Sequence, residues 1–542
     1  MFYLRFYRDR IREFPWLKRP LLLLTALNLV LGATAVGFAY VSKLVLDDIL
    51  QNDVANIVFN ALLLAGFIVF QLVLKTTTNY LATVYQTTTH KRLQDHYVKT
   101  LLGRTLPAIQ SKHTGLWMNH LDSDVVRFSH GVLDIAPRFA FMAFRFVLAF
   151  VLLAYLDWMV ALVLVGFGGV LLIIALTLRE EMKRRHVERQ DAEGAVRSFL
   201  QEQLDHAPVI KSYQAETYTL DLLRGHQTVY ADKQIRSRRL AIVASTGLQA
   251  GFMLAYALVI VLGAYRITLG ALTVGGLVAI LQLTEYMQSP FRIAGNLLPA
   301  YSAMESSFER LQGIAALEVE ATDRVPVRPF DRIVIDNLHF SYGASEILNG
   351  LSFEVRQGSL VHLAGPSGIG KTTFLYLLLG LLRPTGGNIA LVHDDDTQPI
   401  GPETRSYFAF VPQQIRIVSG TIRDNLRYNR DEIDDNALVQ ACQNAVIDKD
   451  IEALPNGYDT VVGERGLGMS EGQLQRLAIA RALLSEASVL ILDEATSALD
   501  KETEQLVLAN LRQLPDKTII LVSHRDVDDD MTYQRIDIGH QP

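Results

Sequence analysis

The residue types most suited to chemistry stand together in a glycine-rich run, GPSGIGKTT. It follows an apolar stretch typical of a buried strand, Ser359 to Ala364, and precedes a helical pattern, FLYLLLGLL. In this strand–loop–helix order, glycines let backbone N–H groups wrap a phosphate chain, and the helix points its positive end at it. The run comprises Gly365, Pro366, Ser367, Gly368, Ile369, Gly370, Lys371, Thr372 and Thr373. We predict a nucleotide-phosphate site in which Lys371 supplies a point charge and Thr372 offers a hydroxyl to Mg²⁺.

Two acidic residues end a second predicted strand, Ser488 to Asp493, whose unbroken apolar pattern is typical of a parallel strand covered on both faces. At its carboxyl end, Asp493 would hold Mg²⁺, and Glu494 would orient and deprotonate an attacking water. Another apolar run, Thr518 to Ser523, delivers His524 to the same edge. Because ligands bind at the carboxyl ends of strands in open α/β sheets, these groups predict a nucleotide-hydrolysing site.

Between these strands, the segment from Met469 to Gln473 heads a helical pattern, LQRLAIARALL. Ser470 is a favourable N-cap residue, and a helix start of this kind can receive an anion. Taken alone, the segment indicates only a capped helix.

Composition separates the chain into two parts. Of its 542 residues 50% are hydrophobic and 20% are charged, and the apolar residues collect in long runs before about residue 300. The net charge of −6 lacks the basic excess expected of a nucleic-acid partner. The single cysteine, Cys442, excludes an internal disulfide and is predicted to be a small core residue.

The apolar runs predict about six membrane-spanning helices, because each approaches the roughly 20 residues that a bilayer requires. A cleaved signal peptide is the alternative for the first run, but that run is long and further runs follow it. The predicted spans are Leu21–Tyr40, Val54–Tyr85, Phe139–Leu156, a stretch after Trp158 up to Leu178, Ala241–Tyr265 and Thr273–Leu298.

Lysine and arginine gather in the two long connections, between the second and third spans and between the fourth and fifth. This bias places those connections and both termini in the cytoplasm. Their helical spacing predicts that the spans continue as helices beyond the membrane. We expect the turns that join them near Gly115 to Asp124 and near Ala207 to Tyr213.

Charged residues inside spans usually face a cavity or a partner. Lys75 and Arg292 fit helix extensions beyond the bilayer, and Glu285 lies within the sixth span. Arg145 lies near mid-span, where a substrate contact and a structural ion pair are both open readings.

The helical pattern gives way to prolines between residues 314 and 330, which marks a domain boundary. We therefore expect a membrane domain over 1–313, a linker over 314–330 and an ATP-binding domain over 331–542. The predicted fold class is an all-α polytopic membrane domain followed by an α/β P-loop domain.

With these motifs in place, the chain resembles an ABC transporter of the exporter type, and the similarity covers nearly the whole sequence. Each match has a role in the family. Tyr342 resembles the aromatic residue that stacks on adenine, Gln413 the glutamine that senses Mg²⁺, and His524 the switch histidine. Val462 to Gly466 resembles a short exporter motif, Met469 to Gln473 the signature, and Ser497 to Asp500 the loop that crosses between subunits.

The resemblance implies a head-to-tail dimer, with each ATP held by the phosphate loop of one chain and by Ser470, Gly472 and Gln473 of the other, near Asp500. It implies ATP and Mg²⁺ as cofactors, with Glu494, His524 and Gln413 catalytic. Glu471 departs from the usual glycine of the signature, and the stretch after His524 is shorter than usual. We expect a homodimer; the alternative is one half of a heterodimer.

The leading hypothesis is export across the cytoplasmic (inner) membrane, with no nucleic-acid partner. A soluble ABC ATPase conflicts with the apolar runs, an importer with the fused domains, and a gated channel with an intact Glu494. Mixed aromatic and polar residues in the spans suit a bulky substrate such as a peptide, while a lipid-linked molecule, a siderophore and a drug stay open. The residues are Phe139, Phe141, Phe144, Arg145, Gln249, Tyr256, Gln282 and Tyr286.

Overall fold

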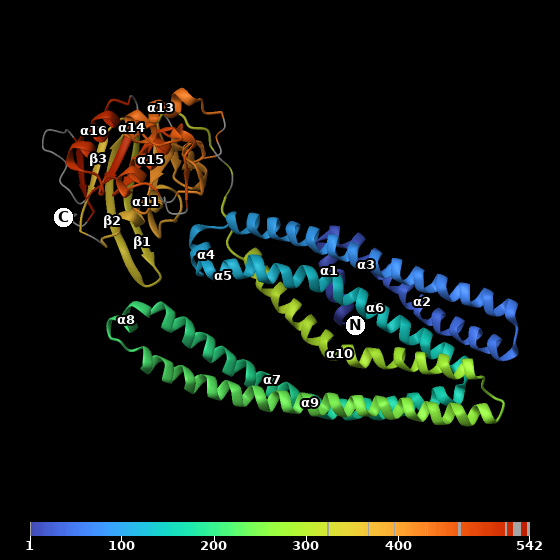
Figure 1. The fold of residues 1–542 in the computed structure, drawn as a ribbon. Coiled ribbons are helices and arrows are strands. Elements are labelled where there is room, and N and C mark those ends of the chain that lie inside the picture. Colours follow the sequence, from blue (N-terminus) through green and yellow to red (C-terminus); the bar gives the residue numbers. More distant parts are fainter. Residues whose placement is uncertain are drawn as a thin grey trace. The chain divides into compact units, whose positions relative to one another are not determined.

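The computed structural model describes residues 2–538, apart from 322, 324, 367, 395, 416, 429, 431, 464–467, 515–516 and 524–532. The chain forms two compact units. We call Met1–Val98 with Trp117–Gly313 the helical unit, and Lys99–Leu116 with Ile314–Pro542 the sheet unit. Figure 1 shows the long helices of the first and the twisted sheets of the second.

Each of the six predicted spans lies within one long helix, which continues well beyond the apolar run. Figure 1 shows α7 and α9 side by side, joined through the short α8. The helices are α1 (Phe2–Glu13), η1 (Pro15–Leu17), α2 (Lys18–Gln51), α3 (Val54–Leu102), α4 (Leu106–Gln110), α5 (Thr114–Asn119), the π-helical turn η2 (His120–Asp124), α6 (Val125–Leu156), α7 (Trp158–Asp205), α8 (Ala207–Ser212), α9 (Glu216–Thr268) and α10 (Val274–Ala315).

Among the described residues, four helical stretches are long and apolar enough to cross a membrane: Pro15–Gln51, Val54–Leu102, Thr114–Leu156 and Glu216–Thr268. They contain the first, second, third and fifth predicted spans. In α7 the continuously described apolar stretch is Trp158–Leu171, and α10 is not among the four stretches. Membrane insertion of the fourth and sixth spans therefore stays a prediction.

The first long connection, between the second and third predicted spans, is a correction to the sequence analysis. We expected its turn near Gly115 to Asp124, but that stretch is helical in α5 and η2. The turn lies earlier, between the end of α3 at Leu102 and the start of α5 at Thr114, and it contains the short helix α4. The second turn lies at α8, where it was predicted.

Three strands of the sheet unit, β3, β9 and β10, were predicted from apolar runs, and each end lies within one residue of its expected position. The strands are β1 (Arg332–Tyr342), β2 (Ser345–Arg356), β3 (Leu360–Ala364), β4 (Gly386–His393), β5 (Asp396–Pro399), β6 (Phe408–Val411), β7 (Gly420–Thr421), β8 (Val461–Val462), β9 (Val489–Asp493), β10 (Thr518–Val522) and β11 (Gln534–Asp537). The helices are α11 (Lys371–Leu378), η3 (Pro402–Tyr407), α12 (Ile422–Arg427), α13 (Asp435–Asn444), α14 (Asp448–Glu452), η4 (Gly457–Asp459), α15 (Glu471–Leu483) and α16 (Lys501–Arg512).

A five-stranded parallel sheet, in the order β11-β3-β10-β9-β6, forms the centre of this unit. Strands β3, β9 and β10 are buried along their whole length, as their continuous apolar runs predicted. A second, antiparallel sheet has the order β2-β1-β4-β5. Helix α11 contributes Phe374, Leu375 and Leu378 to the core cluster that contains residues of both sheets. Cys442 is buried in the other cluster of this unit, as predicted.

Candidate nucleotide-binding site

The parallel sheet brings the predicted chemical residues to one edge. Strand β3 ends directly before Gly365, β9 ends at Asp493 before Glu494, and β6 ends two residues before Gln413. Because all these strands run in the same direction, their carboxyl ends meet on one side of the sheet. Residues more than 120 positions apart in sequence, such as Thr372 and Asp493, thereby come into contact.

The phosphate loop needs glycine at two positions for different reasons. Gly368 has a φ of 82°, in the left-handed region that residues with a Cβ rarely adopt. Gly370 has a φ of 107°, and a Cβ there would lie 2.7 Å from a side-chain carbon of Ile347 in β2. Gly370, at the start of α11, therefore lies directly against β2, and a side chain at either glycine position would be strained.

Lys371 lies against the backbone of this loop. The residue is buried, with only 7% of its surface exposed. Its Nζ donates to the carbonyl oxygens of Gly365, at 2.6 Å, and Pro366, at 3.3 Å. A buried ammonium needs acceptors, and carbonyl oxygens are weaker partners than phosphate oxygens. The Lys371 ammonium group is thus placed where it could bind the oxygens of an incoming phosphate chain.

Asp493 and Thr372 form the part of the site that suits Mg²⁺. Asp493 is 2% exposed, and its carboxylate accepts a hydrogen bond from the Thr372 hydroxyl at 3.2 Å. Burial raises the pKa of the Asp493 carboxyl, the neighbouring Glu494 charge adds to the rise, and Thr372 and Lys371 oppose it. A cation bound beside Asp493 would add to the charge of Lys371, stabilise the ionised carboxylate and offset the cost of burying it. Carboxylate and hydroxyl oxygens are ligands that Mg²⁺ accepts, so the residues fit that ion.

Glu494 is fixed by its backbone and by Gln413. Its φ of 51° lies in the left-handed region, which is unfavourable for a residue with a side chain. Its backbone N–H donates to the carbonyl of Val522 at 3.0 Å, on the neighbouring strand β10. Gln413 Nε2 donates to Glu494 Oε2 at 2.8 Å. Gln413 and Glu494, two of the predicted catalytic residues, are therefore in direct contact.

Tyr342 ends β1, opposite Ser345 in the β1–β2 hairpin that also carries Ile347. It is 51% exposed, and its ring meets Phe340 edge-on at a centroid distance of 4.8 Å. An exposed ring supported from one side offers its face to a planar ligand.

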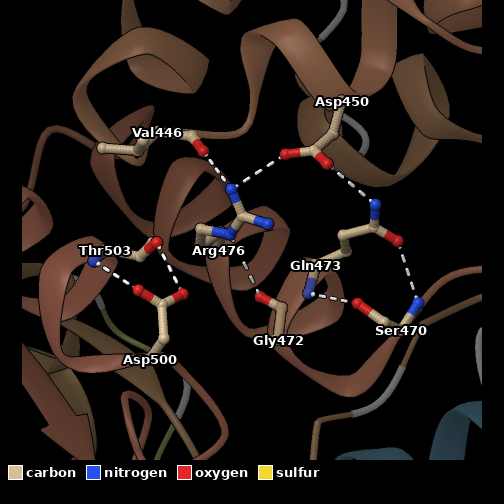
Figure 2. A network of polar contacts seen from close by, with 8 residues as sticks. All are labelled: Val446, Asp450, Ser470, Gly472, Gln473, Arg476, Asp500 and Thr503. Atoms are coloured by element: carbon tan, nitrogen blue, oxygen red, sulfur yellow. Dashed lines mark hydrogen bonds and ion pairs between the residues drawn. The ribbon is translucent and has the colours of Figure 1, made fainter.

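The signature segment forms the second group of predicted residues, drawn in Figure 2. Ser470 caps α15: its hydroxyl accepts from Gln473 N–H at 3.2 Å, and its own N–H donates to Gln473 Oε1 at 2.9 Å. Gly472 packs tightly, since a Cβ there would lie 3.1 Å from the Ala498 carbonyl oxygen. Ser470 and Glu471 are exposed, so the start of α15 is open to a ligand.

Sequence reasoning missed the residues that hold this segment in place. Asp450 in α14 accepts from Gln473 Nε2 at 2.9 Å and pairs with Arg476 at 2.8 Å, and Arg476 also donates to the Val446 carbonyl (Figure 2). Arg476 follows Gln473 by one helical turn, which was a usable signal. Asp450 lies 23 residues from Gln473, and no local pattern pointed to it.

The segment from Glu494 to Asp500 connects the two groups. Ser497 N–H donates to the Glu494 carbonyl at 3.2 Å, and the Ser497 hydroxyl accepts from Gln475 of α15 at 3.1 Å. Asp500 then caps α16, accepting from the N–H of Thr503 at 3.0 Å and from its hydroxyl at 2.8 Å. Hydrogen bonds therefore link Glu494 to the signature helix through Ser497 within one chain. Ser367, His524 and the stretch from Glu464 to Gly466 lie outside the described residues.

Two family models match the sequence. The model described as the ABC transporter transmembrane region matches residues 21–291, and the model described as ABC transporter matches residues 348–497. The second match contains the phosphate loop, Gln413, the signature and Glu494.

Curated relatives and a solved structure agree with these matches. The chain is 27% identical over 451 residues to ABC transporter B family member 1 of Dictyostelium discoideum, covering 80% of this chain and 48% of the relative. It is 31% identical over 384 residues to the ATP-dependent lipid A-core flippase of Chromohalobacter salexigens, covering 69% and 65%. The chain thus spans about half to two thirds of these relatives. A bacterial Atm1-family ABC exporter with ATP bound has the same fold, with a TM-score of 0.78, 24% identity and coverage of 94% and 91%.

Proposed function

Because this chain belongs to the ABC transporter family, with the membrane region and the ATP-binding domain fused in one exporter-type half-transporter, we propose that it drives export by hydrolysing ATP. The observation that carries the proposal is the linked set Lys371, Thr372, Asp493, Glu494 and Gln413 at one sheet edge. The cytoplasmic membrane is the proposed location, with the sheet unit in the cytoplasm.

The residues of this set, together with Tyr342, divide the tasks of the site. Lys371 exchanges its carbonyl partners for the β- and γ-phosphates, and Tyr342 stacks on the adenine. Thr372 and Asp493, assisted by Gln413, would hold Mg²⁺, whose charge would offset that of the phosphates. Glu494 orients the attacking water and takes its proton. Gln413 keeps the Glu494 carboxylate aimed at that water.

Hydrolysis also needs a second chain in this proposal. Ser470, Gly472 and Gln473 lie at a helix start where Ser470 and Glu471 are exposed and the Gln473 side chain is held by Asp450. A helix start of this kind suits the γ-phosphate of an ATP held by a partner, with His524 and Asp500 near the same contact. ATP would then favour the closed dimer by binding it more tightly than the open one.

For the substrate, we propose a bulky amphipathic molecule. A mostly apolar cavity of about 220 Å³ lies between α6, α7, α9 and α10, lined by Phe146, Phe167, Phe252, Thr284 and Gln288 among others. Aromatic walls with a few polar groups suit a ligand that is apolar at one end. A hydrophobic peptide and a lipid-linked molecule both have this chemistry, and one of the relatives is described as a lipid A-core flippase.

The residues predicted to contact substrate from sequence do not line this cavity. Arg145 instead donates to the Ser289 hydroxyl and lies over the rings of Phe141 and Tyr286, at 4.7 and 4.9 Å from their centroids. Phe139 is 64% exposed.

The test is ATPase activity of the purified chain in lipid nanodiscs, with hydrophobic peptides, lipid A-type lipids and amphipathic drugs added separately. We expect stimulation by one class, and none in Glu494→Gln. The class that stimulates decides between a peptide and a lipid-linked substrate. Hydrolysis that is absent in the wild type would contradict the proposal.

Dimerisation has its own test, because a homodimer and a heterodimer would both explain the residues. Glu494→Gln should trap the closed state, so native mass spectrometry with Mg²⁺ and ATP should show two identical chains. A chain that stays monomeric under these conditions would contradict the homodimer.

A further inference from the structure

The linker after α10 pairs with the end of α3 inside the sheet unit. The Glu320 N–H donates to the Gly103 carbonyl at 3.0 Å, and the Thr105 N–H donates to the Glu318 carbonyl at 3.1 Å. Arg104 and Val319 form an antiparallel bridge between these bonds. The segment Lys99–Leu116 therefore belongs to the same compact unit as the nucleotide site, although it follows a predicted membrane span.

Arg405 joins this linker to the helix that begins at the phosphate loop. Two of its nitrogens, Nη1 and Nη2, donate to the Glu320 carboxylate at 3.1 and 3.0 Å. Nε donates to the Leu379 carbonyl and Nη2 also to the Gly380 carbonyl, both at 3.1 Å. These carbonyls end α11, where the helix dipole favours a cation. One guanidinium thus binds the linker and the end of α11 together, a geometry that only arginine offers.

Helix α11 is short and held firmly. It is about 12 Å long at 1.5 Å per residue, and Phe374, Leu375 and Leu378 are buried in the core. The turn after it is equally tight: a Cβ on Gly380 would lie 2.4 Å from the backbone of Gly401, next to the η3 segment that carries Arg405. Because α11 is tightly packed, a displacement of the phosphate loop at its start should move its far end by nearly the same distance.

We propose that Arg405 and Glu320 are positioning residues that couple the phosphate loop to the end of α3 within one chain. The path runs from Lys371 along α11 to Arg405, then through Glu320 to Gly103. The inference rests on the proposed function, since it requires that ATP moves the membrane domain. Breaking the Arg405–Glu320 pair changes no residue at the nucleotide. It removes the link through which α11 is connected to the end of α3.

A neighbouring ion pair supplies a matched control. Glu318 lies two residues before Glu320 and pairs with Arg383 at 3.6 Å, but these side chains are 61% and 71% exposed. The Glu320 and Arg405 side chains are 18% and 34% exposed. Exposed pairs contribute little, so Glu318→Gln should behave as the parent, whereas Glu320→Gln and Arg405→Lys should not.

The experiment uses spin-label distances between the two chains of the dimer, with Cys442→Ala as background. One label at Gln51→Cys, at the end of α2, reports the membrane half, and one at Asn456→Cys reports the ATPase half. In the parent, Mg²⁺ with ATP in the Glu494→Gln background should shift both distances. In Glu320→Gln the Asn456 shift should persist, while the Gln51 shift falls below half of the parent value.

The outcomes separate the two proposals. A Gln51 shift in Glu320→Gln and Arg405→Lys that equals the parent shift would overturn the coupling role and leave the exporter intact. Loss of the Gln51 shift and the Asn456 shift in Glu318→Gln, as in Glu320→Gln, would also overturn the coupling role. The shifts would then depend on the linker as a whole and not on the Arg405–Glu320 pair. A parent that shows no ATP-dependent shift at either label would overturn the proposed function and the coupling role with it.

Discussion

Two buried aspartates, Asp493 in the sheet unit and Asp124 in the helical unit, lie in contrasting surroundings. They are almost equally buried, 2% and 1% exposed. Asp124 accepts from Arg310 at 2.6 and 2.9 Å and from the Ser307 hydroxyl at 2.8 Å, and it lies 2.8 Å from His120 Nδ1. Within the described part of the chain, the Asp493 carboxylate is hydrogen-bonded to Thr372 alone.

We interpret the difference as that between a structural carboxylate and a proposed metal-binding one. A buried charge needs compensation, and Asp124 receives it from the protein, joining the π-helical turn before α6 to the end of α10. Asp493 receives less compensation, from Thr372 and Lys371, and burial raises its pKa. A divalent cation would supply the rest of that compensation. Four substitutions test this contrast and the residues around it.

The largest effect is expected beside Asp493. Glu494→Gln keeps the size of the side chain but cannot take a proton, so ATP hydrolysis should fall by about 100-fold or more. Binding of ATP should be retained, because Lys371 and the loop are unchanged. Phosphate release and nucleotide binding measure the two separately, and near-normal turnover would refute the assigned role.

Asp493→Asn removes the charge that should hold Mg²⁺. In the presence of Mg²⁺, ATP affinity should fall by about 10- to 100-fold, while affinity in EDTA should stay the same. Because burial raises the Asp493 pKa, the wild type should also need more Mg²⁺ as the pH is lowered toward that pKa. Equal losses with and without Mg²⁺ would mean that Asp493 is structural, like Asp124.

Asp124→Asn should act on stability instead. It leaves Arg310 without its carboxylate and should cost about 2–4 kcal/mol, lowering the apparent Tm by roughly 5–10 °C. The Mg²⁺ dependence of ATP binding should not change. The control is Asp134→Asn in the following helix α6, whose pair with Arg138 is 41% and 53% exposed and should matter little. Similar Tm values for both variants would contradict the structural role.

The smallest effect is expected at Glu471. This acid is exposed at the first position of α15, where it suits the helix dipole but would face the partner's phosphates. Glu471→Gln should tighten ATP-dependent dimerisation about threefold at low salt, and the gain should shrink at high salt. Titrations of dimer formation at two ionic strengths measure it. Weaker dimerisation in the variant would show that the acid assists ATP.

The sequence predicted the nucleotide edge well for a physical reason. Asp493 and Glu494 stand at the end of one apolar strand, Lys371 lies one loop beyond the end of another, and parallel strands align those ends. The start of α15 at Ser470 was likewise written in a local capping pattern.

Contacts between distant segments account for what the sequence did not reveal. The turn after α3 was expected at Gly115, but the chain breaks at Gly103, where it pairs with linker residues more than 200 positions later. Asp450 and Arg405 act through partners that no local spacing connects to them. The substrate is hidden for the same reason, since a cavity is built from four separate helices.

The central claim, that the signature of one chain completes the phosphate loop of another, is tested most directly by mixing two inactive chains. Lys371→Ala breaks the phosphate loop, and Ser470→Arg breaks the signature, so either homodimer should hydrolyse almost no ATP. A mixed dimer of the two would contain one doubly broken site and one intact site. We predict that co-expression, with isolation of the mixed dimer by two different tags, restores substantial ATPase activity. A mixed dimer as inactive as its parents would contradict the account.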